Sequence, residues 1–179
     1  MFFRSERLFL RPAWPEDAAA IHAAIADEAV VRNLARVPWP YTEADARWFA
    51  SQPQDERLPR CLITLPGAAG SEVIGAVSLF EKDGSVNLGY WIAPRHWGQG
   101  YATEAARAML TLARGIGHRR IVAGHFLDNP ASGRVLRRLG FRQTAERAGM
   151  ASRYEIALEP SLGDCDDTPD GGMPTRCAA

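Results

Sequence analysis

The stretch GYWIAPRHWGQGYATEA, residues 89–105, places two glycines between a strand pattern and a helix pattern. Apolar residues alternate over 86–92 before the loop, and small apolar residues recur at helical spacing after it. Gly98 and Gly100 have no Cβ, so both can take positive φ angles and let a ligand approach the backbone. A glycine loop at a helix N-terminus directs several N–H groups at one point, where the helix dipole also favours an anion. The pattern predicts a phosphate-binding loop, and a plain strand-to-helix turn is the alternative.

Two common nucleotide-binding motifs do not match this loop. The dinucleotide fingerprint G-x-G-x-x-G needs a third glycine where Thr103 stands. The P-loop needs G-K-[ST] at its end, and no lysine follows Gly98 or Gly100 in the loop. These mismatches, and the antiparallel strand pattern ahead of the loop, exclude a nucleotide-binding oxidoreductase domain.

Composition and charge narrow the class of protein. The 179 residues are 46% hydrophobic and 23% charged, which suits a single domain core. Lys plus Arg and Asp plus Glu both number 21, so no net field favours nucleic acid or a membrane surface as a partner. Cys61, Cys165 and Cys177 lack metal-ligand spacing, so we expect neither a disulfide framework nor a zinc site. Charges within residues 1–12 argue against a signal peptide or membrane span, and we expect a cytoplasmic protein.

Periodicity predicts an α+β chain with two helices ahead of the main sheet. The expected elements are, in order, a strand and a helix within 7–34, a helix over 41–52, three antiparallel strands within 60–94, a helix over 103–115, a strand over 119–129, a helix over 130–140 and a strand over 153–160. Thr42 is expected to cap the second helix, and Asp83-Gly84 to form a hairpin turn. Gly115 is expected to end the helix that follows the glycine loop.

The glycine loop is part of a longer pattern, [Q/R]-x-x-G-x-[G/A], followed about thirty residues later by Asn and a Gly-Phe pair. Residues 95–100 carry the first part, and DNPASGRVLRRLGF, residues 128–141, carries the second. With RLFLRP (7–12) and WPYTEADARWF (39–49), these segments resemble the GNAT superfamily of acyl-CoA-dependent N-acyltransferases, above all its bacterial ribosomal-protein N-terminal acetyltransferases. The resemblance is collinear over about residues 5–158.

This resemblance implies the acyl-CoA N-acyltransferase fold, an α+β fold in which helices flank a mixed, twisted central sheet that splays open in its middle. Acetyl-CoA would be the co-substrate, with its pantetheine arm in the gap, and no metal would be needed. We expect this acetyltransferase domain over residues 1–160. Residues 161–179 are rich in Gly, Pro and Asp and are expected to form a flexible tail. The chain would act as a monomer or homodimer.

The resemblance also assigns residues to the acetyl-CoA site. The pyrophosphate would lie on the backbone N–H groups of one run, made of Arg95, His96, Trp97, Gly98, Gln99, Gly100, Tyr101, Ala102 and Thr103. Backbone N–H groups near Trp91 and Ile92 would bind the oxyanion, and Asn129 would hold the pantetheine amide. Ser132, three residues after this asparagine, would lie near the sulfur; a capping hydroxyl at the start of its helix is the alternative. Many family members carry a tyrosine where Leu136 stands, and it is missing here.

The general base is left open by the resemblance. Family members often carry a glutamate at the position that Asn87 fills, and an amide cannot accept a proton. His125 and Glu155 are replacements by chemistry alone, and chains of water are the alternative.

These observations predict an N-acetyltransferase that moves the acetyl group of acetyl-CoA directly to a primary amine. The expected acceptor is the α-amine at the N-terminus of a protein or peptide. The missing glutamate and tyrosine leave two alternatives: an acyl-CoA-binding module impaired in catalysis, and an acetyltransferase for a small-molecule amine.

Overall fold

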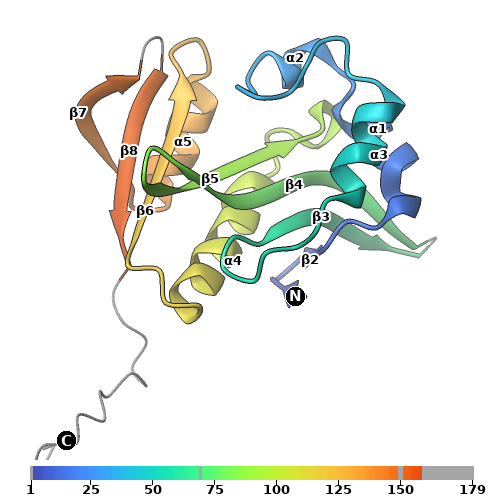
Figure 1. Cartoon of the computed structure of the whole chain (residues 1–179), viewed down its shortest axis with the longest axis horizontal. Coiled ribbons are helices and arrows are strands. Elements are labelled where there is room, and N and C mark those ends of the chain that lie inside the picture. The colour runs from blue at the N-terminus through green and yellow to red at the C-terminus, as the bar shows by residue number, and fades with distance from the viewer. Residues whose placement is uncertain (1, 69, 149–150, 159–179) are drawn as a thin grey trace, which may run out of the picture.

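The computed structural model describes residues 2–68, 70–148 and 151–158, so the expected boundary at residue 160 and the tail over 161–179 lie outside the described residues. One sheet of eight strands runs through this part of the chain, in the order β1-β2-β3-β4-β5-β6-β8-β7 (Figure 1). Its strands are β1 (Phe3–Arg4), β2 (Phe9–Arg11), β3 (Arg60–Gly67), β4 (Gly70–Lys82), β5 (Ser85–Ile92), β6 (Arg120–Phe126), β7 (Arg142–Ala148) and β8 (Ala151–Ala157). The β5–β6 pair is parallel and the other neighbours are antiparallel, so the predicted mixed sheet is confirmed.

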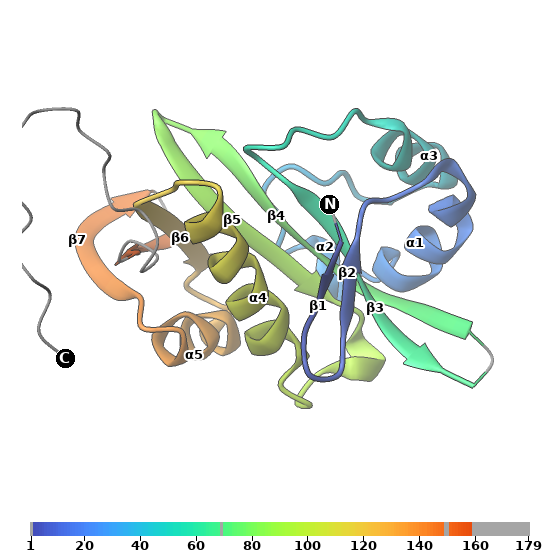
Figure 2. The same ribbon diagram turned by 90° about the horizontal axis from the view of Figure 1, so that it is seen from below.

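Helices cover both faces of the sheet. They are η1 (Pro15–Asp17), α1 (Ala18–Ile25), α2 (Glu28–Val31), α3 (Glu43–Ser51), η2 (Pro94–His96), α4 (Tyr101–Gly115) and α5 (Pro130–Arg138). Helices α4 and α5 lie along one face of the sheet, as seen from below in Figure 2. Their apolar side chains share a core with β4, β5 and β6. Helices α1, α2 and α3 gather over the other face (Figure 1) and share a second core with β3 and β4.

Local sequence explains why these elements start and turn where they do. The Thr42 hydroxyl accepts the N–H of Asp45 at 3.2 Å, and the Asp45 carboxylate accepts the N–H of Thr42 at 2.8 Å, so the predicted cap of α3 is confirmed as a capping box. Asp83 and Gly84 have φ angles of 52° and 66° between β4 and β5. Positive φ at both central residues is what a tight two-residue hairpin requires, and the predicted turn is confirmed.

The sheet opens between β5 and β6. Strand β4 pairs with β5 through eight residue pairs, from Lys82↔Ser85 to Gly75↔Ile92. Strand β5 pairs with β6 only through Asn87↔Val122 and Leu88↔Ala123, after which β6 continues alongside β8. The two strands therefore diverge beyond Leu88, which confirms the splayed sheet and leaves a gap between two arms of the fold.

Five short or weakly patterned elements were not predicted: β1, η1, α2, η2 and β7. Strand β1 has two residues and α2 has four, too few for a period to be recognised, and β7 (RQTAERA) has no apolar alternation. The predicted end of α4 at Gly115 is confirmed, but the glycine that takes a positive φ, of 93°, is Gly117. The N–H groups of Gly117 and His118 return to the carbonyls of Arg114 and Ala113, which closes the helix in a Schellman motif.

Two further features bear on the class of protein. Within the described residues, the helices are too short or too polar to cross a membrane. Cys61 is buried in β3, whereas Cys165 and Cys177 lie outside the described residues.

Candidate active site

The glycine loop joins β5 to α4 in the conformation that an anion site needs. Gly98 and Gly100 have φ angles of 76° and 83°, and Gly100 is the N-cap of the 15-residue helix α4. A Cβ placed on Gly98 would meet no atom within 4 Å, so the backbone is open to an approaching ligand there. The positive φ angles expected of both glycines are confirmed, and phosphate binding stays a prediction.

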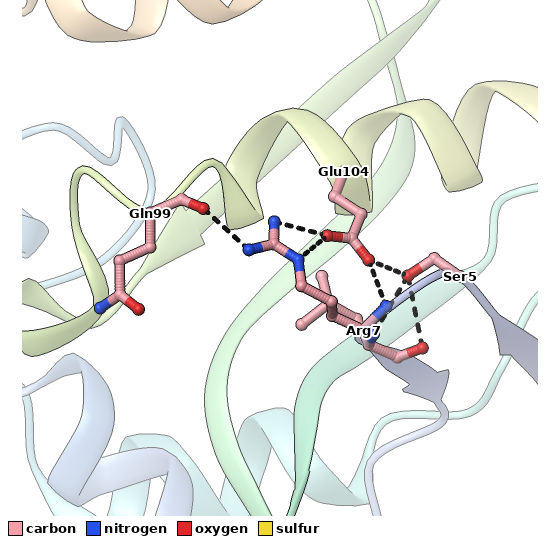
Figure 3. Close-up of polar contacts among 5 residues, drawn as sticks. Ser5, Arg7, Gln99 and Glu104 are labelled. Carbon is pink, nitrogen blue, oxygen red and sulfur yellow. Dashed lines mark hydrogen bonds and ion pairs between the residues drawn. The ribbon is translucent and has the colours of Figure 1, made fainter.

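The N-terminal hairpin holds the far side of this loop (Figure 3). Glu104, in the first turn of α4, accepts hydrogen bonds from the backbone N–H of Arg7 at 2.7 Å and from the Ser5 hydroxyl at 2.7 Å. The Arg7 guanidinium donates to Glu104 at 2.8 Å through Nε and to the Gln99 carbonyl at 3.2 Å through Nη1. The guanidinium also lies over the ring of Tyr101, 4.5 Å from its centroid. The hairpin between β1 and β2 therefore fixes both the loop and the first turn of α4.

The charge of Glu104 is balanced by the same contacts. Burial raises the pKa of this carboxyl, but hydrogen bonds from the Arg7 N–H, the Ser5 hydroxyl and the Arg7 guanidinium outweigh burial and leave the pKa below its ordinary value. The group is ionised at neutral pH and is only 13% exposed, beside an Arg7 side chain that is 44% exposed. The carboxylate is thus neutralised before any anion reaches the helix N-terminus.

Side chains of the loop itself turn back onto β4 and β5. Arg95 donates to Glu72 at 2.8 Å and 2.9 Å, and His96 Nε2 lies 3.1 Å from the same carboxylate. Hydrogen bonds from His96 and Arg95 lower the pKa of Glu72. The Trp97 indole N–H donates to the Ile92 carbonyl at 2.6 Å while half of the side chain stays exposed. These side chains position the loop. The N–H groups of His96 and Trp97 donate to the carbonyls of Ala93 and Pro94 at 2.9 Å and 3.0 Å, which removes these two from the run predicted to bind the pyrophosphate.

Backbone donors at the end of β5 face the gap. The N–H of Ala93 donates to the Ile74 carbonyl of β4 at 2.8 Å. Successive N–H groups of a strand point to opposite edges, so the N–H of Ile92 points away from β4, toward β6. Strand β6 no longer pairs with β5 at this level. Of the two residues predicted to supply an oxyanion donor, Trp91 and Ile92, the geometry favours Ile92.

The start of α5 brings Asn129 and Ser132 to the same gap. Asn129 is the N-cap of α5, and its Oδ1 accepts the N–H of Ser132 at 3.2 Å. The Ser132 hydroxyl instead lies 2.8 Å from the hydroxyl of Tyr90 on β5. The alternative in which Ser132 caps the helix is therefore wrong, because Asn129 fills that role with its own side chain.

An open hollow of about 300 Å³ lies where the gap meets the surface. Trp97 of the glycine loop lines one part of it, and Asn129, the N-cap of α5, and Arg134, in the middle of α5, line another. Arg32, just after α2, completes the rim through a 2.5 Å ion pair with Asp128. The glycine loop and the start of α5, which are far apart in sequence, thus face one space.

Asn87 is engaged in the fold and does not supply a base. Its amide nitrogen donates to the carbonyls of Ser85 at 2.8 Å and Lys82 at 3.3 Å, which ties it to the β4–β5 hairpin. Directly across the sheet, Asn87 pairs with Val122 and Val122 pairs with Glu155, so the three side chains share one face. Glu155 is 35% exposed and lies 3.6 Å from Arg120. It is the carboxylate in line with the position that the family glutamate would fill.

His125 lies under α5, with partners at both ring nitrogens. Nδ1 is 2.7 Å from the Phe126 carbonyl and Nε2 is 3.3 Å from the Tyr154 hydroxyl. The ring packs so closely on Gly133 that a Cβ there would come within 2.6 Å of Nε2. A role for His125 as base stays a prediction, and this packing favours a structural role.

Sequence reasoning missed Tyr90, Arg7 and Glu104 as parts of the site. A hydroxyl-bearing residue within the apolar alternation of 86–92 was the available signal for Tyr90. Nothing in the sequence links Arg7 to Glu104, because 97 positions separate them and no period spans that distance.

Comparison with known proteins identifies this arrangement. The structure superposes on that of a GNAT-family acetyltransferase from Bacillus anthracis with a TM-score of 0.74 and 24% sequence identity. The match covers 88% of this chain and 98% of the other. RimL, a ribosomal L7/L12 alpha-N-protein acetyltransferase solved with coenzyme A, matches with a TM-score of 0.72 and 21% identity over 88% of this chain and 98% of its own. The fold is that of the acyl-CoA N-acyltransferases.

Sequence matches take the identification further. The acetyltransferase (GNAT) domain family matches residues 7–142. YoaA of Bacillus subtilis strain 168, an uncharacterized N-acetyltransferase, is 30% identical over 148 residues, which cover 78% of this chain and 81% of YoaA. The chain belongs to the GNAT acetyltransferase family and is an acetyl-CoA-dependent N-acetyltransferase.

Proposed function

We propose that this enzyme acetylates the α-amine at the N-terminus of a protein or peptide. The observation that carries the proposal is Asn87, whose amide is bonded to the hairpin and stands where a carboxylate base would be expected. An enzyme without that base favours an amine that arrives neutral. A structural neighbour, RimL, is an alpha-N-protein acetyltransferase, which supports the same class of acceptor.

Amine basicity gives this preference a magnitude. An α-amine with a pKa of about 7.8 is roughly 14% neutral at pH 7, whereas a lysine with a pKa of about 10.4 is roughly 0.04% neutral. The ratio is about 300 in favour of the α-amine before any contact with the enzyme. The greater intrinsic nucleophilicity of lysine offsets part of this ratio.

Residues of the gap fit acetyl-CoA, which supplies an acetyl group activated as a thioester. We assign the pyrophosphate to the backbone N–H groups of residues 98–103, because the positive φ angles of Gly98 and Gly100 open that backbone to a ligand, whereas the N–H groups of His96 and Trp97 are used within the fold. Asn129 uses Oδ1 for the helix cap, so its amide N–H groups are the donors that it can offer to the pantetheine arm.

The chain's own groups then serve a direct transfer from the thioester to the amine. We assign the N–H of Ile92 to the thioester oxygen, where negative charge develops during the attack. We assign the Ser132 hydroxyl to the sulfur, where it donates a hydrogen bond to the departing thiolate. A thiol with a pKa of about 8.5 is a fair leaving group, so a hydrogen bond is enough help.

Two matched peptides test the acceptor. One has a free N-terminus and no lysine, and the other has a blocked N-terminus and one lysine in otherwise the same sequence. Release of the CoA thiol is followed at saturating acetyl-CoA. At pH 7 we expect the first peptide to react at least tenfold faster. Its rate should rise about fourfold between pH 7 and pH 8, because the neutral fraction of the α-amine rises from roughly 14% to roughly 61%.

The same assay separates the other functions. Faster acetylation of the lysine peptide at pH 7 would show that the acceptor proposal is wrong. Turnover with small amines but with neither peptide would indicate a small-molecule acetyltransferase. Binding of acetyl-CoA without thiol release for any amine would indicate an acyl-CoA-binding module impaired in catalysis.

A further inference from the structure

The hydroxyl of Tyr90 reaches from one arm of the fold to the other. Tyr90 lies on β5 two residues beyond Leu88, the last residue paired with β6, so its side chain stands where the strands have separated. Its oxygen is 2.8 Å from the Ser132 hydroxyl and 3.3 Å from the Ser132 carbonyl, both on α5. The ring of Tyr90 packs against the core under α4 and α5.

Packing alone does not require this hydroxyl. Val86, Leu88 and Ile92 lie on the same face of β5 as Tyr90, and all four side chains belong to or pack on one apolar core. A phenylalanine at position 90 would fill the same space without taking a polar group out of water. Core packing therefore explains the ring of Tyr90 but not its hydroxyl. The short contact of that hydroxyl is with Ser132.

Hydrogen-bond lengths indicate which hydroxyl donates. An O–H···O bond is normally 2.5–3.0 Å, so the 2.8 Å contact with the Ser132 oxygen is a good bond, and the 3.3 Å contact with the carbonyl is a poor one. If Ser132 donated to Tyr90, the Tyr90 hydrogen would be left with the poor acceptor. If Tyr90 donates to the Ser132 oxygen, its single hydrogen goes to the better of the two acceptors, the long contact with the carbonyl is given up, and the Ser132 hydrogen is free to point elsewhere.

We propose that Tyr90 is a positioning residue that donates its hydroxyl hydrogen to Ser132 and thereby directs the Ser132 hydrogen toward the leaving sulfur. The inference rests on the role proposed above for Ser132. The amine nitrogen forms its bond to the acetyl carbon, the carbon–sulfur bond breaks, and the thiolate leaves with its electron pair. Ser132 stabilises this thiolate by a hydrogen bond, and the thiolate takes the proton that the acetylated nitrogen loses.

Acid–base properties of Tyr90 suit a permanent donor. Burial raises the pKa of Tyr90 to about 12, against a smaller lowering by the bond with Ser132. The phenol keeps its proton at every pH at which the α-amine titrates. Ser132 can accept this bond and still donate its own hydrogen, because a hydroxyl has one donor and two acceptor sites.

The test is a double-mutant cycle of Tyr90→Phe and Ser132→Ala on kcat. It uses whichever of the two peptides reacts faster, so the preference for α-amines and the role of Tyr90 are judged separately. We expect Tyr90→Phe to lower kcat about five- to tenfold and to leave the KM for acetyl-CoA within twofold, because the bond acts only as the thiolate forms. In the Ser132→Ala background, Tyr90→Phe should lower kcat no further.

A matched control is Thr64→Val. The Thr64 hydroxyl is fully buried and donates to the Phe9 carbonyl at 2.8 Å, in the part of the sheet away from the gap. This variant also loses one buried hydrogen bond, and we expect a lower melting temperature with kcat unchanged.

Three outcomes would overturn the inference. An unchanged kcat in Tyr90→Phe, alongside a reduced kcat in Ser132→Ala, would refute the positioning role of Tyr90 and leave the proposed function intact. An equal loss from Tyr90→Phe in both backgrounds would show that Tyr90 acts without Ser132. Unchanged kcat in both single variants, with chemistry rate-limiting, would remove the role of Ser132 together with that of Tyr90.

Discussion

Gly100 shows how one residue can serve the fold and the site at once. Its φ of 83° ends the loop and starts α4, and a Cβ placed on it would lie 3.6 Å from the Arg7 guanidinium. Gly117 has a similar φ of 93° at the other end of the same helix, with open space around it. The two glycines thus share a backbone conformation but not a place in the proposed acetyl-CoA site.

This pair allows a controlled test of the loop. We expect Gly100→Ala and Gly117→Ala each to cost about 1–2 kcal/mol of stability, because an L-residue is strained in the left-handed region. Only Gly100→Ala should weaken CoA binding, by about tenfold or more, since relaxing its φ turns the N–H groups of the loop away from the phosphates. Calorimetric titration with CoA and thermal melting measure the two effects. Equal changes in CoA affinity for both variants would show that the loop is only a structural turn and does not bind the phosphates.

Single residues could be predicted from the sequence when their role is local. The positive φ of Gly98 and Gly100 and the cap at Thr42 follow from residue type and spacing within a few positions. The partner of the Ser132 hydroxyl could not be predicted, because Tyr90 lies 42 positions away and the two meet only after β5 and α5 have packed. For the same reason, the sequence left open the alternative that Ser132 caps its helix, a role that Asn129 fills.

At the scale of elements, the β1–β2 hairpin is a support for the start of α4. Its polar contacts with Glu104 and Gln99 connect two segments that are far apart in the chain (Figure 3). Arg11, at the other end of β2, makes a comparable ion pair with Asp17 at 2.7 Å but contacts nothing in the glycine loop. Arg7 lies in the turn before β2 and Arg11 is the last residue of β2, and of these two arginines only Arg7 reaches the proposed phosphate site.

We expect Arg7→Gln to raise the KM for acetyl-CoA about tenfold, equivalent to about 1.4 kcal/mol, the size of one hydrogen bond to a charged group. The loss has two parts, since the loop loses the hydrogen bond that Arg7 donates to the Gln99 carbonyl and the charge of Glu104 is no longer neutralised. The kcat should stay within twofold, because the thioester end of the gap is unaffected. Arg11→Gln serves as the control, with a lower melting temperature and an unchanged KM. A similar rise of KM in both variants would contradict a specific role for Arg7.

Elements with a long, regular pattern were predictable, and short ones were not. Helix α4 and the β4–β5 hairpin carry clear periods and a clear turn, and both are confirmed. Strand β7 and helix α2 owe their existence to partners supplied by tertiary structure, so no local pattern marks them. The end of α4 at Gly115 was predicted as well, whereas the Schellman bonds that close the helix form around Gly117.

At the scale of the whole molecule, two arms meet at a narrow junction. One arm holds β1 to β5 and the glycine loop, and the other holds β6 to β8 and α5 (Figure 1). Eight residue pairs join β4 to β5, but only two join β5 to β6. The splay that makes room for a ligand therefore removes backbone hydrogen bonds that a continuous sheet would have. The resemblance to a family implied this opening, whereas hydrophobic periodicity alone cannot distinguish a splayed sheet from a closed one.

A ligand that contacts both arms should restore part of the missing stability. We expect CoA at one hundred times its Kd to add about 2.7 kcal/mol to the free energy of unfolding, which raises the melting temperature by roughly 5–11 °C for a chain of this size. Acetyl-CoA should act alike, because the groups assigned to the pyrophosphate do not sense the acetyl group. Hydrogen exchange locates the bound ligand. When CoA is added, the amides of residues 90–92 and 124–126, beside the gap, should gain more protection than those of Leu62 and Ile63 within β3. A melting temperature unmoved by millimolar CoA would refute binding in the gap, and protection spread evenly over the sheet would show that the ligand does not join the arms.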